Sequence, residues 1–346
     1  MRMLKTVVPA LAVVLFVLPE AWAWGADVHR TITLLALDGL PADAPAWLRE
    51  PDVRARAASQ AVQPDRWRDS DALVLKHVND PEHYLDVEDL GQFGLTLDTI
   101  PRLRREYLRL MVLAKAACPE RIALYDPNSD PARAREWPGF VLHAVAENYA
   151  RLQAAFRHVG IVEELHDPGR RAELEQLRAV VVYHIGELSH FVGDIAQPLH
   201  TSRHYNGWVG DNPSGYHWRE RFHAYVDSGA VETHGLNYAR LRPLVKYDLK
   251  VDPRDPWNDV CAYLQRSHAA LEPLYALERD GKLDRGEGRA LVAGRLSDAV
   301  AMLSALIRGA CADSEPTERR IESFRRFDGR PMTDAGPAQP STAPAE

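Results

Sequence analysis

The most informative residues form one short run with two histidines and an aspartate at fixed spacing. The run reads His190-Phe-Val-Gly-Asp194-Ile-Ala-Gln-Pro-Leu-His200. Residues four apart share a helix face, so His190 and Asp194 can offer a nitrogen and an oxygen to one metal ion. His200 follows just past the proline that ends such a helix. Imidazole and carboxylate ligands without thiolate are typical of catalytic zinc sites rather than closed structural ones.

Further candidate ligands lie on both sides of this run. His223 and Asp227 are again four residues apart, and His83 is followed by Asp86 and preceded by Asp65. Taken singly, each pair also fits a helix with a hydrogen-bonded histidine and no metal. Each pair is therefore evidence for a metal site only as part of a larger set of ligands.

Two of these candidates have competitors nearby. His217 and Glu220, three residues apart, could replace the downstream pair, and Asp69 could replace the upstream aspartate. The spacing alone leaves these alternatives open.

Residues 1–23 resemble a secretory signal peptide. Arg2 and Lys5 precede an apolar run from Val7 to Leu18, and Ala21-Trp22-Ala23 is a small-x-small cleavage site. The run is short for a membrane span, although an uncleaved anchor is the alternative. We expect export to the periplasm or the cell exterior.

Cleavage after Ala23 would make Trp24 the first residue of the mature chain. A free α-amine has a pKa near ~7.7–8, so it is partly neutral at physiological pH and can bind zinc together with its own carbonyl oxygen. His29 follows five residues later. The alternative is an aromatic residue that follows a signal peptide by accident.

These residues together resemble the ligand set of one superfamily, which contains the bacterial zinc-dependent phospholipases C and the S-one/P-one type single-strand nucleases. The resemblance covers residues 24 to about 227, and the Gly-Asp-x-x-Gln-Pro-Leu-His run is its most specific part. The nine matching positions, in family order, are Trp24, His29, Asp65, His83, His190, Asp194, His200, His223 and Asp227.

The resemblance implies a cluster of three Zn²⁺ ions inside an all-α, multi-helix domain. It assigns the first zinc to Asp65, His83, His190 and Asp194, the second to Trp24, His29 and Asp194, and the third to His200, His223 and Asp227.

Such a cluster suits the hydrolysis of phosphate esters. Zinc lowers the pKa of a bound water toward about 7, and a further zinc can neutralise the phosphoryl oxygens and the leaving group. Asp65 is the candidate for orienting the attacking water. Arg68, one helical turn later, is the candidate phosphate contact, and a plain surface arginine is its alternative.

The metal ligands do not separate a nuclease from a phospholipase C. Asp65-x-x-Arg68, His83-Tyr-x-Asp86 and a final aspartate at Asp227 resemble the nuclease branch. Against it, Ala196 stands where that branch commonly has a histidine. Arg66 stands where choline-binding phospholipases have a tyrosine, and an arginine cannot form an aromatic cage for a quaternary ammonium.

We therefore expect a phosphodiesterase for single-stranded nucleic acid or nucleotides, with a phospholipase C for a non-choline lipid as the alternative. Asp86, Tyr205 and Trp208 are the candidate substrate contacts, and the two aromatic side chains could serve as platforms for stacked bases. The alternative role of Tyr205 and Trp208 is to anchor the loop after His200. A secreted, non-catalytic zinc-binding module is the alternative of another class. No stable protein partner is implied, and we expect a monomer.

Long helical patterns position these residues. Apolar residues recur every three or four positions over 101–117, 140–157, 171–196, 256–271 and 287–312. Turn residues make 201–216 a loop. We expect one domain over residues 24–313 and a polar, disordered tail over 314–346.

The chain has 346 residues and a formal net charge of -7, which excludes a protein that binds nucleic acid mainly through positive charge. Its three cysteines, Cys118, Cys261 and Cys311, are too few and too scattered for a disulfide scaffold. Cys261 and Cys311 share the C-terminal region and could pair.

Overall fold

The computed structural model describes residues 24–68 and 70–327, and this part of the chain is helical without a β-strand. The expected all-α class is therefore confirmed. The α-helices are α1 Ala26–Asp38, α2 Pro51–Gln60, α3 Gln63–Arg68, α4 Leu73–Asn79, α5 Arg104–Ala117, α6 Val141–Glu164, α7 Arg171–Ala196, α8 Phe222–Ala224, α9 Ala230–Thr233, α10 Tyr238–Leu241, α11 Trp257–His268, α12 Leu271–Arg279, α13 Gly286–Ala312 and α14 Glu318–Phe327.

Shorter turns connect them. The 3₁₀ turns are η1 Ala46–Arg49, η2 Asp80–His83, η3 Val87–Phe93, η4 Pro119–Arg121, η5 Pro168–Arg170, η6 Pro198–Thr201 and η8 Arg242–Leu244, and η7 Tyr225–Gly229 is a π-helical turn.

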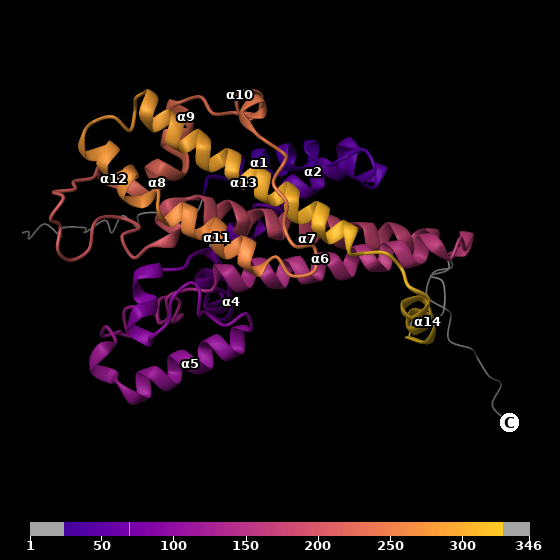
Figure 1. The fold of residues 1–346 in the computed structure, drawn as a ribbon, viewed down its shortest axis with the longest axis horizontal. Helices are drawn as coiled ribbons and strands as arrows, with labels where there is room; N and C mark the ends of the chain where they lie inside the picture. Colours follow the sequence, from indigo (N-terminus) through magenta and orange to yellow (C-terminus); the bar gives the residue numbers. More distant parts are fainter. Residues whose placement is uncertain (1–23, 69, 328–346) are drawn as a thin grey trace, which may run out of the picture.

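Helices α6 and α7 form the spine of the molecule. They run side by side along its long axis, and α13 crosses them (Figure 1). Helix α13 is long and apolar enough to cross a membrane by composition, but most of it is buried against α1, α6 and α7. One large apolar core includes residues from Trp24 to Ala310, and a second, smaller cluster joins Phe222 of α8 to Leu271, Leu274 and Tyr275 of α12.

Helix α2 approaches α7 closely at Gly186. A Cβ atom there would lie 2.9 Å from the carbonyl oxygen of Ala57, which a larger residue would not tolerate. This contact matters for the site because Ala61, just after α2, bonds to a histidine of α7.

The expected disordered tail is wrong for its first part, because residues 318–327 form helix α14. Its Phe324 is buried and packs with Ile161 and Val162 of α6, and the guanidinium of Arg170 lies over the Phe324 ring. Two apolar side chains on one face of a charged segment are enough to dock it. The expected signal peptide and residues 328–346 lie outside the described residues.

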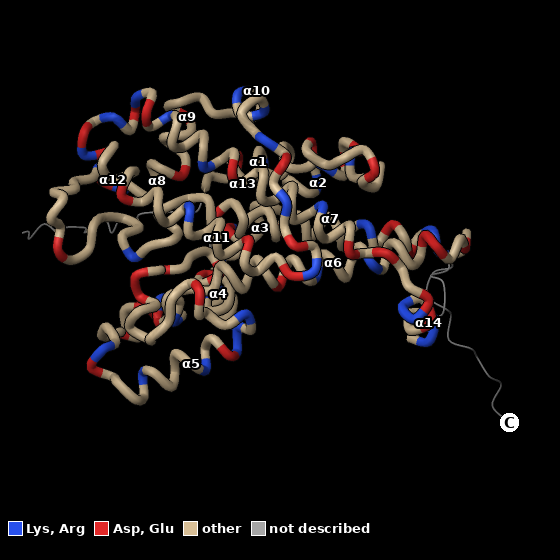
Figure 2. The backbone as a smooth tube through the Cα atoms, viewed as in Figure 1, with Lys and Arg blue, Asp and Glu red and all other residues tan. Residues whose placement is uncertain are grey.

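The charges of the surface helices are mixed. In the view of Figure 2, α14 carries both basic and acidic positions, and α5 carries mostly basic ones with a single glutamate. All three cysteines are free thiols, so Cys261 and Cys311 do not pair.

Candidate metal centre

The side chains of eight predicted ligands meet in three groups in the interior. The first group is Asp65, His83 and His190; the second is His29, His190 and Asp194; the third is His200, His223 and Asp227. Within each group, one ligand atom from each residue lies within 4.8 Å of the others, and every member is buried. These groups can each hold a metal ion, and the first two share His190.

Carboxylate oxygens and imidazole nitrogens face one another in the first two groups. Asp194 lies between two rings, with Oδ1 3.5 Å from Nε2 of His29 and Oδ2 3.3 Å from Nε2 of His190. Oδ1 of Asp65 lies 3.8 Å from Nε2 of His83 and 3.9 Å from that of His190. Tetrahedral ligands about 2.0–2.1 Å from a zinc ion lie about 3.3 Å apart, so these separations suit ligands of a common ion.

The third group is tighter. Nε2 of His223 lies 2.9 Å from Nε2 of His200 and 3.3 Å from Oδ2 of Asp227. His223 belongs to α8, and Asp227 belongs to the π-helical turn η7 that follows it. Such turns are rare and are frequent at functional sites.

Backbone carbonyls fix the orientation of three of the histidines. The Nδ1–H of His190 donates to the carbonyl oxygen of Ala61 at 2.9 Å. The Nδ1–H of His83 donates to that of Asn79 at 2.9 Å, and the Nδ1–H of His200 donates to that of His83 at 2.7 Å. A ring that donates through Nδ1 has its lone pair on Nε2, the atom that faces each group. This arrangement is typical of metal-ligating histidines.

Several polar atoms of the centre are buried without a hydrogen-bond partner among the described residues. They are both ring nitrogens of His29, Nε2 of His83 and His190, both carboxylate oxygens of Asp194 and Oδ2 of Asp227. An unpaired polar group in the interior costs about 1–3 kcal/mol, and more if it is charged. The donor set therefore fits cations of the kind that imidazole and carboxylate bind together.

Burial and mutual repulsion set the protonation states. Burial lowers the pKa of His29, His83, His200 and His223, which keeps these rings neutral and able to ligate. Burial opposes the charged form of His190, but the carboxylates of Asp194 and Asp65 outweigh it and raise the pKa of His190 to about 9. A cation bound here would take the place of that proton.

Gly193 and Gln197 allow this packing. A Cβ atom on Gly193 would lie 2.9 Å from Nδ1 of His29, so glycine makes room for the ring. Gln197 is fully buried; its Nε2 donates to Oδ1 of Asp227 at 2.7 Å, and its Oε1 accepts the N–H of Leu199 at 2.7 Å. Gln197 thus holds one ligand of the third group and the turn that carries His200.

Trp24 lies next to this centre. It is 1% exposed, and the N–H of the following Gly25 donates to the carbonyl oxygen of Asp227 at 3.2 Å. Its predicted role as an amine and carbonyl ligand requires cleavage after Ala23 and stays a prediction.

A cavity of about 540 Å³ opens onto the centre. Three of its lining residues are the metal-group histidines His83, His200 and His223. Three further lining residues, Arg68, Asp86 and Tyr205, are predicted catalytic or substrate contacts.

Arg68 lines the cavity beside a carboxylate of the first group, and Asp86 lines it as a buried carboxyl group. The Arg68 guanidinium is 3.8 Å from Oδ1 of Asp65, at the end of helix α3 that carries both. Burial raises the pKa of Asp86 to about 7.

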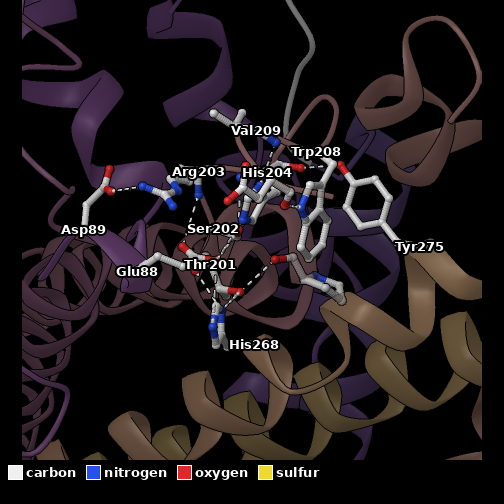
Figure 3. A network of polar contacts seen from close by, with 12 residues as sticks. Glu88, Asp89, Thr201, Ser202, Arg203, His204, Trp208, Val209, His268 and Tyr275 are labelled. Atoms are coloured by element: carbon white, nitrogen blue, oxygen red, sulfur yellow. Dashed lines mark hydrogen bonds and ion pairs between the residues drawn. The ribbon is translucent and has the colours of Figure 1, made fainter. Parts of the chain in front are cut away.

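Trp208, by contrast, is not among the residues that line the cavity, and its role as a substrate contact stays a prediction. Its ring stacks on His204 at 4.1 Å and packs edge-on against Tyr275, while its Nε1 donates to the carbonyl oxygen of Asp211 (Figure 3). The tryptophan anchors the loop after His200 because α12 supplies an aromatic surface that the loop sequence does not reveal.

Two residues of the site, Gln197 and Arg135, were not predicted from the sequence. Gln197 belongs to the run of predicted ligands, and its place there could have indicated a supporting role. Arg135 lines the cavity from a long irregular segment, and no motif marks it.

Comparison with known proteins adds no relative: no protein-family model matches the chain, and no curated protein matches it.

Proposed function

We propose that this protein is a secreted zinc-dependent hydrolase of phosphate esters, related to the zinc-dependent phospholipases C and the S-one/P-one type nucleases. One observation carries the proposal: three buried histidine and aspartate groups, with several polar atoms that have no hydrogen-bond partner among the described residues, adjoin a cavity with an arginine at its wall. A closed structural site has no need of such a cavity.

Bound zinc would lower the pKa of a water molecule and would neutralise negative charge on the phosphoryl oxygens. The chain's own residues would do the rest. The carboxylate of Asp65 can accept a hydrogen bond from the attacking water and orient it. The guanidinium of Arg68 can donate to a phosphoryl oxygen, since it lines the cavity beside Asp65.

Single-stranded nucleic acid is the first substrate to test. Tyr205 is 36% exposed and lies at the cavity wall, where its ring contacts His223 edge-on at 5.8 Å. An aromatic side chain at this place can stack on a base next to the attacked phosphate.

A second candidate is a phospholipid without choline. Helix α4 carries three exposed apolar side chains, Leu73, Val74 and Val78, at 53%, 77% and 51% exposure. Leu73 also lines the cavity. Exposed apolar side chains that gather at a site entrance are typical of contact with an apolar partner, and a lipid substrate would bring one.

The deciding experiment uses protein that begins at Trp24, loaded with zinc, against single-stranded DNA, RNA and mixed phospholipid vesicles, each with a chelated control. We expect chelator-sensitive cleavage of nucleic acid. Release of a phosphorylated headgroup instead would assign the phospholipase C function. Zinc-loaded protein that hydrolyses none of these would contradict the proposal and favour a zinc-binding module.

A further inference from the structure

Arg135 is held between two aromatic rings at the cavity wall. Its guanidinium carbon lies 4.3 Å from the ring centre of Tyr84 and 4.6 Å from that of Tyr205. Stacking of this kind suits a planar guanidinium, because the ring faces are electron-rich and the N–H groups stay free at the edge of the plane.

The backbone around Arg135 is fixed as well. The N–H of Arg135 donates to Oδ2 of Asp130 at 2.8 Å, and the hydroxyl of the buried Tyr84 donates to the carbonyl oxygen of Ala134 at 2.6 Å. The neighbouring Arg133, in contrast, points away into an exposed ion pair with Glu136 at 2.8 Å. Arg133 therefore forms an ion pair at the surface, whereas Arg135 lines the cavity.

Arg135 makes no ion pair with any carboxylate of residues 24–68 and 70–327. Acidic groups do share the cavity wall, since Asp80, Asp86 and Asp130 line it with Arg135. A cavity-lining guanidinium with no ion pair among the described residues is suited to an anion that comes from outside.

Arg135 and Arg68 have different neighbours in the cavity. Arg68 lies 3.8 Å from Asp65 of the first group, whereas Arg135 lies against the Tyr205 ring, which contacts His223 of the third group at 5.8 Å. A phosphate at the metal groups would lie beside Arg68, so an anion at Arg135 would be a different group of the same substrate. Lys76, which also lines the cavity, adds positive charge there.

We propose that Arg135, stacked between Tyr84 and Tyr205, forms a subsite for a second phosphate of the substrate, next to the one that is hydrolysed. This rests on the proposed function and narrows its substrate class to compounds with two neighbouring phosphates. A nucleotide strand and a phosphorylated lipid headgroup both offer this chemistry.

The test compares pairs of probes that differ by one phosphate, with binding measured by calorimetry on the zinc-loaded protein. One pair is thymidine 5′-monophosphate and thymidine 3′,5′-bisphosphate. The other is inositol 1-phosphate and inositol 1,4-bisphosphate. We expect one bisphosphate to bind roughly 10- to 100-fold more tightly than its monophosphate, as a hydrogen-bonded charge pair provides. The pair that shows the preference identifies the source of the phosphate.

Variants then assign the preference to Arg135. Arg135→Met removes the charge and the fork of donors and should abolish most of the preference, whereas Arg135→Lys, which keeps charge but cannot stack as a plane, should retain part of it. Arg133→Met is the matched control and should keep the full preference. Thermal unfolding and zinc content of each variant establish that it folds.

Equal affinity of the wild-type protein for both members of each pair would overturn the subsite, and so would a preference that survives in folded Arg135→Met. Hydrolysis is measured separately on bis(4-nitrophenyl) phosphate. If the protein prefers the bisphosphate but hydrolyses nothing, the subsite is supported and the proposed function is refuted. If it hydrolyses the ester but shows no preference, the proposed function is supported and the subsite is refuted.

Discussion

The metal centre and the polar network after His200 both contain histidines and carboxylates, but these side chains differ in their hydrogen-bond partners. In the network, Oε1 of Glu88 accepts from the Ser202 hydroxyl at 2.6 Å, and Nδ1 of His204 accepts the N–H of Val209 at 2.9 Å (Figure 3). Nδ1 of His268 donates to the carbonyl oxygen of Thr201 at 3.0 Å.

In the metal centre, Asp194 has neither oxygen hydrogen-bonded to the described protein, and His29 has neither ring nitrogen bonded. The difference teaches that a histidine near a carboxylate indicates a ligand only when the protein leaves its polar atoms without partners. His204 carries its hydrogen on Nε2, because Nδ1 is an acceptor, and so offers no lone pair toward Glu88. The network secures a loop, and the centre is built for cations.

The largest expected effect comes from replacing a histidine in each region. His190→Ala removes a ligand shared by two groups, and should lower metal affinity by more than about 100-fold together with activity, since even supporting residues are worth 10–100-fold. His204→Ala is the matched change in the network and should keep the metal content. Elemental analysis after dialysis checks both, and an unchanged metal content in His190→Ala would sink the assignment of the first two groups.

The second effect concerns the amino terminus. Any residue retained before Trp24 would convert its amine into an amide, which cannot bind zinc through a lone pair. We expect a chain with an uncleaved N-terminal tag to hold less zinc and to lose most activity compared with a chain that begins at Trp24. Full zinc content and activity in the tagged chain would show that Trp24 is not a ligand.

The third effect compares two buried glutamines, Gln197 beside the metal centre and Gln153 away from it. Gln197→Leu leaves Asp227 without its hydrogen bond and should weaken metal binding at the third group by about 10–100-fold. Gln153, which donates to the carbonyl oxygen of Pro253 at 2.7 Å away from the centre, gives the control Gln153→Leu. Titration with a zinc indicator measures both, and equal affinities in the two variants would mean that Gln197 only supports the fold.

The smallest effect concerns His143, a buried histidine outside the centre. Its Nε2–H donates to the carbonyl oxygen of Pro101 at 2.9 Å, and burial lowers its pKa to about 4. Because the unfolded chain, with a pKa near 6.5, binds the proton more readily, stability from this group is lost as pH falls from 6.5 toward 4.

At pH 5 this loss amounts to about 2 kcal/mol of the unfolding free energy. In excess chelator, His143→Phe should therefore lose less stability than the wild type between pH 7 and pH 5. Urea unfolding at both values measures the difference. Parallel pH dependence in the two proteins would show that His143 does not titrate in this way.

The sequence predicted the long helices well and the short ones poorly. The apolar repeat predicted a helix over 171–196, and α7 has these bounds. Helix α1 was not predicted, although Asp27, Arg30 and Thr31 lie on its less buried face and Ile32, Leu35, Ala36 and Leu37 are buried. The helix in the C-terminal tail was missed because its few uncharged residues, Ile321, Ser323, Phe324 and Phe327, give no clear apolar repeat.

For the site, fixed spacing predicted the ligands, and tertiary packing decided the rest. His190 and Asp194 are adjacent on one helix face, so four-residue spacing places them together. Arg135 owes its position to Tyr84 and Tyr205, which lie far from it in the chain, and no local pattern reveals that. The packing of Trp208 against Tyr275 of a later helix could not be predicted for the same reason.

The central claim is that the three buried groups hold zinc ions that the reaction needs. The most direct measurement is the zinc content of protein that begins at Trp24, before and after graded chelation, with hydrolysis of bis(4-nitrophenyl) phosphate followed in the same samples. The account predicts three zinc ions per chain and a loss of hydrolysis that follows their removal. Fewer than two bound zinc ions, or hydrolysis that persists after the zinc is gone, would contradict it.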